Sequence, residues 1–132
     1  GGIKYKGVKN NAKKILFIED ETDLVMLMQA RLVSHGYQML SASDGEKGLK
    51  MVQEEKPDLI LLDKIMPKMD GLEVCQRLKS APQTKDIPII IVSASGGKDL
   101  PGRCLAAGAN DFIFKPFEAK DLLVKIKALL KE

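Results

Sequence analysis

The chain has 132 residues, enough for one domain with one substantial hydrophobic core. Its 21 basic and 18 acidic residues are interspersed and leave a formal charge of +3, so no broad single-sign surface favours nucleic acid or an anionic membrane. No apolar run reaches the ~18–20 residues of a membrane span, and no hydrophobic signal segment opens the chain. We therefore expect a cytoplasmic protein.

The first residues are polar and basic. Residues 1–13 are interpreted as a leader or linker, and residues 14–132 as the folded domain. Several lysines lie in or beside the leader and are interpreted as solvated rather than as a binding arm: Lys4, Lys6, Lys9, Lys13 and Lys14.

Two kinds of apolar pattern alternate along the rest of the chain. Short β-branched runs predict strands, and longer segments with apolar residues at helical spacing predict helices. In chain order the pattern predicts strand Ile15–Ile18, helix Asp23–Ser34, strand Gln38–Ala42, helix Gly45–Glu55, strand Leu59–Leu62, helix Asp70–Lys79, strand Ile89–Val92, helix Pro101–Ala107, strand Phe112–Phe114 and helix Glu118–Leu130. The first, third and fourth strands are apolar throughout, as in parallel strands covered by helices on both faces.

Several residues mark where the helices begin and end. Gly36 follows the first helix as a C-terminal stop, and Pro57 closes the second. Asp70 and Glu73 have the spacing of a capping box for the third helix. The fourth helix is the weakest, since helix-breaking residues surround its start: Gly96, Gly97, Pro101 and Gly102.

Alternating strands and helices with right-handed crossovers favour an open, doubly wound α/β sheet, in which chemistry gathers at the carboxyl ends of the strands. Polar side chains follow four of these ends: Glu19, Asp20 and Glu21 after the first strand, Asp63 after the third, Ser93 at the fourth and Lys115 at the fifth. Each alone is commonly just a polar strand end. Their conjunction indicates one site.

The residue types indicate the chemistry of this site. Clustered carboxylates repel each other and are stable mainly around a hard cation such as Mg²⁺. The Ser93 hydroxyl and the Lys115 ammonium would complete a binding set for a phosphoryl group, whose transfer depends on positioning and charge neutralisation. Asp63 is the best candidate for the nucleophile.

Over residues 14–132 the chain resembles the response-regulator receiver family, the phosphoacceptor domains of two-component signalling. Four segments carry the resemblance: ILFIEDE, LILLDKIMPKMDG, PIIIVSAS and AGANDFIFKPF. The resemblance implies a flavodoxin-like (βα)5 sheet with strand order 2-1-3-4-5. It also implies that Asp20 and Asp63 bind Mg²⁺ directly, that Glu19 acts through metal-bound water, and that the backbone carbonyl of Ile65 completes the protein ligands.

The same resemblance assigns further roles. Ser93 and Lys115 would contact the phosphoryl oxygens, and Ser93 and Phe112 would form the conformational switch. The Lys115–Pro116 bond would be cis. Ile65 and Ser95 occupy the positions that govern access of the hydrolytic water, and the apolar Ile65 predicts slow loss of the phosphoryl group.

The function implied is a conditional interaction switch. A histidine kinase or histidine phosphotransfer protein would phosphorylate Asp63, and a downstream protein partner or effector domain would bind the altered surface. The domain would catalyse only its own phosphorylation and dephosphorylation and is not otherwise an enzyme. Three positions depart from the commonest pattern: Glu19 replaces an aspartate, Lys64 replaces an apolar residue, and the start of the fourth helix is unusually rich in Gly and Pro.

Three other functions compete with this interpretation. A haloacid-dehalogenase-type phosphatase needs a second aspartate two residues after the nucleophile, where this chain has Ile65. A flavodoxin-like FMN carrier needs a phosphate-binding loop after the first strand, where Glu19, Asp20 and Glu21 would repel the phosphate. A receiver-like interaction module that is never phosphorylated is the third alternative.

Outside this site, the remaining polar candidates have structural interpretations. Cys75 and Cys104 lack metal-site spacing and are predicted to be buried, reduced thiols. His35, the only histidine, is predicted to lie solvated in the last turn of the first helix.

Overall fold

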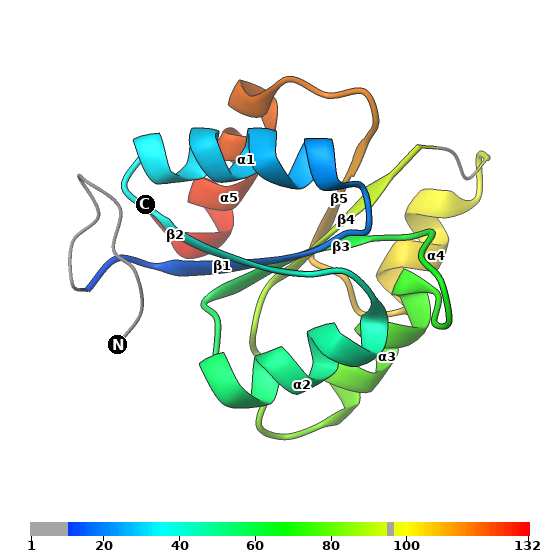
Figure 1. Cartoon of the computed structure of the whole chain (residues 1–132). Coiled ribbons are helices and arrows are strands. Elements are labelled where there is room, and N and C mark those ends of the chain that lie inside the picture. The colour runs from blue at the N-terminus through cyan, green and yellow to red at the C-terminus, as the bar shows by residue number, and fades with distance from the viewer. Residues whose placement is uncertain (1–10, 95–96) are drawn as a thin grey trace.

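The computed structural model describes residues 11–94 and 97–132, which alternate strictly between strands and helices (Figure 1). The elements are β1 (Lys14–Ile18), α1 (Thr22–Ser34), β2 (Gln38–Ala42), α2 (Gly45–Glu55), β3 (Leu59–Asp63), α3 (Gly71–Ser80), β4 (Ile89–Ser93), α4 (Leu100–Ala106), β5 (Asp111–Phe114) and α5 (Ala119–Leu130). The five strands pair in parallel in the order β2-β1-β3-β4-β5, which confirms the predicted fold.

The sheet separates two hydrophobic clusters. Helices α1 and α5 cover one face, and α2, α3 and α4 cover the other (Figure 1). Successive β1 side chains alternate between them: Ile15 and Phe17 pack with the α1 and α5 layer, and Leu16 and Ile18 with the opposite layer. Burial of each such side chain stabilises the fold by about 1.5–3 kcal/mol, so the strands form a firm base for the loops.

Helix α4 is short, and its start differs by one residue from the prediction. It begins at Leu100 rather than Pro101, because the Leu100 side chain is fully buried in the core. Its N-cap residue, Asp99, makes no side-chain capping bond. The seven-residue α4 is therefore anchored by packing more than by local hydrogen bonds.

Asp70 caps the start of α3, but through the Leu72 N–H and not through the Glu73 N–H that the predicted capping box would use. The Asp70 carboxylate accepts a hydrogen bond from the Leu72 N–H at 2.6 Å. The Glu73 carboxylate instead pairs with Arg77, one turn later, at 3.1 Å. An i, i+4 ion pair on the exposed helix surface thus takes the acid that a full capping box requires.

Several smaller predictions are confirmed. Gly36 adopts a φ of 89° just beyond α1, and the exposed His35 places Nδ1 2.8 Å from the Arg31 carbonyl oxygen. Cys75 and Cys104 are free and buried. The Lys115–Pro116 peptide bond is cis. Most of the predicted leader, residues 1–10, lies outside the described residues.

Within the described residues, no helix has the length and apolar character needed to cross a bilayer.

Candidate functional site

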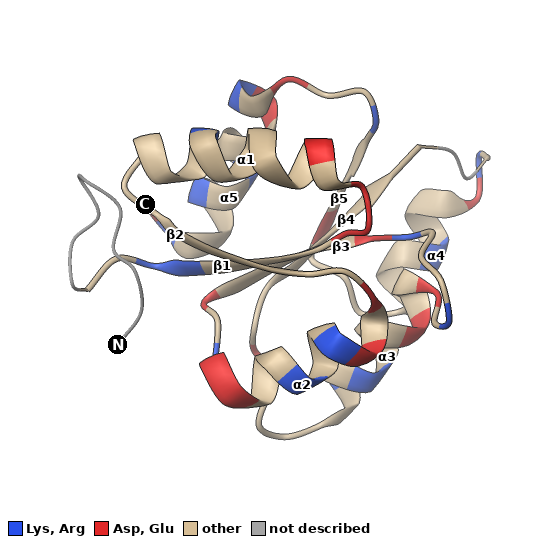
Figure 2. Cartoon of the chain, viewed as in Figure 1, with Lys and Arg blue, Asp and Glu red and all other residues tan. Residues whose placement is uncertain are grey.

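The strand register brings the polar ends of β1, β3, β4 and β5 to one edge of the sheet. Ile18 pairs with Leu62, so the next residues along the two strands, Glu19 and Asp63, lie side by side. Ser93, at the end of β4, pairs with Phe114, the residue before Lys115. Figure 2 shows the acidic segments that follow β1 and β3 close together at this edge.

Three carboxylates form a compact cluster here. Glu19, Asp20 and Asp63 each offer an oxygen within 4.8 Å of the others. Glu19 and Asp63 are only 2% and 5% exposed, whereas Asp20 is open to solvent. Hard oxygen ligands on one open and two buried side chains fit a cation such as Mg²⁺, which binds one or two carboxylates and keeps several waters.

The pKa of the Glu19 carboxyl group is raised in this site. Burial raises the pKa of its carboxyl group to about 7, the hydrogen bond from Lys115 acts in the opposite direction, and the neighbouring Asp63 adds to the rise. A nearby cation would relieve both the desolvation and the repulsion between the acids. The departure from aspartate at this position thus leaves a carboxylate in the cluster.

Lys115 provides the positive charge of the site. Its Nζ lies 2.6 Å from Glu19 Oε1, 3.6 Å from Glu21 Oε2 and 3.7 Å from Asp63 Oδ2. Burial alone would lower the pKa of Lys115, but the hydrogen bond with Glu19 and the surrounding carboxylates raise it overall. Its backbone N–H donates to the Ser93 carbonyl at 2.7 Å, which ties the ends of β4 and β5 together.

The β3–α3 loop holds Asp63 by its backbone. The Ile65 N–H donates to Asp63 Oδ1 at 3.4 Å, and the Gly71 N–H donates to the Lys64 carbonyl at 2.8 Å. A Cβ on Gly71 would collide with the Asp63 carbonyl oxygen and lie 2.9 Å from the Lys64 Cα. Only glycine permits this close approach of α3 to the loop.

The remaining predicted residues lie around this centre. Ser93 is buried at the end of β4. Ile65 projects into solvent, with 58% of its surface exposed, and a ligand role for its carbonyl stays a prediction. Phe112 is half-buried on β5, and its ring packs edge-on against Phe114 with centroids 5.4 Å apart. Ser95 lies outside the described residues.

Sequence reasoning missed one residue of the site, Gly71, and one contact, that of Glu21 with Lys115. Gly71 follows an aspartate at a helix start, a signal for capping that does not reveal its contact with the Asp63 backbone. Glu21 lies past the strand end at the start of α1, as expected, but its contacts were not foreseen: its carboxylate lies 3.6 Å from Lys115 Nζ, and its N–H donates to Glu19 Oε2 at 3.2 Å. The run of three acids was its only sequence signal.

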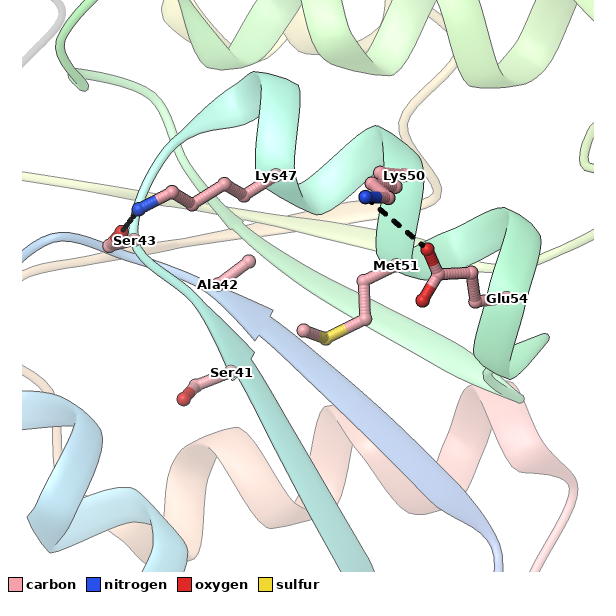
Figure 3. Close-up of a pocket in the computed structure, with 7 residues that line it drawn as sticks. All are labelled: Ser41, Ala42, Ser43, Lys47, Lys50, Met51 and Glu54. Carbon is pink, nitrogen blue, oxygen red and sulfur yellow. Dashed lines mark hydrogen bonds and ion pairs between the residues drawn. The ribbon is translucent and has the colours of Figure 1, made fainter.

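A separate hollow of about 470 Å³ lies between β2 and α2 (Figure 3). Its lining consists of Ser41, Ala42, Ser43, Lys47, Lys50, Met51 and Glu54. Lys47 extends to the Ser43 hydroxyl, and Lys50 faces Glu54. None of the acidic cluster lines this hollow, so it is distinct from the candidate site.

Comparison with known proteins identifies the family. The family model for the response regulator receiver domain matches residues 15–127. The chain belongs to the response regulator receiver domain family. This receiver domain is a two-component signalling module rather than a true enzyme, and its acidic pocket is typical of a phosphoacceptor site.

Among curated relatives, the chain is 41% identical over 119 residues to the alkaline phosphatase synthesis transcriptional regulatory protein PhoP of Bacillus subtilis, covering 90% of this chain and 49% of that protein. It is 42% identical over 123 residues to the probable transcriptional regulator ycf27 of Cyanophora paradoxa, covering 92% and 49%. The receiver domain thus spans about half the length of these relatives.

Solved structures of receiver domains and response regulators are similar to this fold. A response regulator from Chloroflexus aurantiacus superposes with a TM-score of 0.87 at 30% identity, over 92% of this chain and all of that one. The receiver domain of sensor histidine kinase PA1611 from Pseudomonas aeruginosa gives a TM-score of 0.83 at 26% identity, over 92% and 99%. That structure holds a magnesium ion coordinated in its active site cleft.

Proposed function

We propose that Asp63 accepts a phosphoryl group beside a bound Mg²⁺, and that the modification changes the surface presented to a protein partner. The observation that carries this proposal is the placement of Asp63: its carboxylate belongs to the three-acid cluster and also lies 3.7 Å from the Lys115 ammonium. A nucleophile that shares a cation site and a fixed positive charge is equipped for phosphoryl transfer.

In the proposed reaction, one Asp63 carboxylate oxygen forms a bond to phosphorus while the phosphorus–nitrogen bond of a phosphohistidine breaks. The donor is a histidine kinase or a histidine phosphotransfer protein. Asp20, Asp63 and the Ile65 carbonyl would hold Mg²⁺ directly, Glu19 would act through metal-bound water, and the ion would supply charge neutralisation. Lys115 and the Ser93 hydroxyl bind the phosphoryl oxygens and hold the group in line for attack.

The proposed switch follows from the added charge. A phosphoryl group brings about −1.5 to −2 charge at neutral pH, and this charge attracts the Ser93 hydroxyl and the Lys115 ammonium. Movement of Ser93 frees space toward which the half-buried Phe112 ring can turn. The surface around α4, β5 and α5 then shifts between two arrangements, one of which a downstream protein or effector domain binds.

We also propose the extent of the unit. Residues 14–132 form the receiver domain, and residues 1–13 form a leader or linker. This division rests on the first strand, which begins at Lys14. The lengths of the curated relatives suggest an effector domain in a longer protein as one output.

The decisive experiment is exposure of the protein to acetyl phosphate or phosphoramidate with Mg²⁺, followed by intact mass. We expect one adduct of about 80 Da, a single phosphoryl group, on the natural protein. The Asp63→Asn variant should keep its fold and gain none. A persistent adduct on that variant would show that Asp63 is not the phosphoacceptor. Absence of an adduct on the natural protein would favour an interaction module that is never phosphorylated.

A further inference from the structure

Glu21 closes a ring of contacts around Lys115. The Glu21 N–H donates to Glu19 Oε2, and Glu19 Oε1 accepts from Lys115 Nζ at 2.6 Å. The Glu21 carboxylate then returns to the same Nζ at 3.6 Å. One residue at the N-cap of α1 therefore contacts both members of the shortest ion pair in the site, Glu19 through its backbone and Lys115 through its side chain.

The three acidic neighbours of Lys115 differ in one respect. Glu19 and Asp63 belong to the carboxylate cluster that fits a cation, and Glu21 does not. A cation bound to that cluster competes with Lys115 for the Glu19 and Asp63 oxygens, because a divalent ion attracts a carboxylate more strongly than an ammonium does. Glu21 is the neighbour that stays available to Lys115.

We propose that Glu21 is a positioning residue for Lys115: its carboxylate holds the ammonium at the mouth of the site once a cation engages Glu19 and Asp63. The consequence for phosphorylation rests on the proposed function of Asp63. The Glu21 side chain is 60% exposed, so solvent screens the pair and the expected effects are modest, about two- to fivefold.

Two substitutions of Glu21, one that changes its charge and one that changes its length, distinguish positioning of Lys115 from a general effect of charge. Glu21→Gln removes the charge and keeps the length, whereas Glu21→Asp keeps the charge and shortens the reach by one methylene. Because the contact is already 3.6 Å, the aspartate cannot maintain it without movement of the backbone. If Glu21 positions Lys115 by direct contact, both variants should change the reactivity of Lys115 to the same extent. If only the negative charge near Lys115 matters, Glu21→Asp should leave that reactivity as in the natural protein.

The first test uses no phosphorylation. A brief pulse of an amine-acetylating reagent is applied with and without saturating Mg²⁺, and acetylation of Lys115 is quantified by peptide mass relative to the exposed Lys120. We expect Glu21→Gln and Glu21→Asp to raise the Lys115 ratio about two- to fivefold with Mg²⁺, and by less without it. Asp23→Asn, which removes an exposed charge two residues further on, is the matched control and should leave the ratio unchanged.

An unchanged Lys115 ratio in Glu21→Gln with Mg²⁺ overturns the proposal, as does a rise in Asp23→Asn of the same size. This result is independent of Asp63, so failure of the natural protein to gain a phosphoryl group would refute only the proposed function.

The second test links the contact to rate. At saturating Mg²⁺ and acetyl phosphate, Glu21→Gln should slow phosphorylation about two- to fivefold, while its Mg²⁺ affinity stays near that of the natural protein. In a Lys115→Met background the same substitution should have no effect, because Glu21 acts through the ammonium. Full additivity of the two substitutions would show that Glu21 acts independently of Lys115.

Discussion

The position of Asp63 depends on a residue that carries no side chain. Gly71 begins α3 directly beside the Asp63 carbonyl, and its N–H anchors the Lys64 carbonyl of the intervening loop. Asp63, the loop and the helix are therefore fixed by backbone contacts, and the Asp63 carboxylate is free to join the acidic cluster. Any side chain at position 71 must displace one of these parts.

Gly71→Ala should lower the free energy of unfolding by about 1–3 kcal/mol, since the added methyl group overlaps backbone atoms that cannot rotate away. Urea unfolding followed by circular dichroism measures the change. Gly102→Ala in α4 is the control: its Cβ meets open space, and the better helix former should stabilise the protein by about 0.5–1 kcal/mol. Equal effects of the two substitutions would contradict this account of Gly71.

Ile65 should limit the loss of the phosphoryl group. Its exposed apolar side chain, two residues after Asp63, cannot hydrogen-bond a water in line with phosphorus. Replacing Ile65 with Asn should therefore speed dephosphorylation by about three- to tenfold, measured by intact mass at fixed pH and saturating Mg²⁺. Decay at the natural rate or slower would show that this position does not control water access.

At the scale of secondary-structure elements, α4 is the shortest helix that the structure describes. Its seven residues lack a side-chain N-cap and include Pro101 and Gly102. It nevertheless covers both thiols: Cys104 lies on its buried face, and the Cys75 thiol on α3 donates to the Ala107 carbonyl at its C-cap at 3.4 Å. Local opening of α4 would therefore expose both cysteines together.

The two thiols should react slowly with an alkylating reagent in the native protein. Both are fully buried, and burial raises the pKa of Cys75 to about 11 and that of Cys104 above its usual range. Gly102→Ala, by favouring the helical state by about 0.5–1 kcal/mol, should slow native alkylation about two- to fivefold. Mass spectrometry measures the alkylation rate of the two cysteines under native and urea-denatured conditions. Native alkylation as fast as in urea would contradict the burial of the two thiols.

On the scale of the whole molecule, one hydrogen bond joins the start of β2 to the end of α5. The buried Tyr37 hydroxyl donates to Glu132 Oε1 at 2.5 Å across 95 positions of sequence. Tyr37→Phe keeps the packed ring and should reduce the free energy of unfolding by about 0.5–1.5 kcal/mol. Glu132→Gln keeps an acceptor and should cost less. A larger loss in Glu132→Gln would show that the hydroxyl is not the source of the effect.

The fold was predictable because hydrophobic runs of two periods alternate cleanly, and the acids, Ser93 and Lys115 then follow from strand ends meeting at one edge. What escaped prediction depends on distances between loops. The Glu21 contact with Lys115 and the approach of Gly71 to Asp63 require the folded path of two loops, which periodicity does not encode. The observed start of α4, Leu100, differs from the predicted start, Pro101, because burial of Leu100 outweighs the weak local helix signals of this segment.

The division of the core by the sheet has a consequence for engineering. Since the cluster under α1 and α5 shares no residue with the cluster under α2, α3 and α4, each can be redesigned as a separate compartment. Substitutions on opposite sides should combine additively when they lie more than about 7–10 Å apart without shared partners. Thermal stability could thus be increased by substitutions in the cluster under α1 and α5, while the packing of α4 in the other cluster is left unchanged.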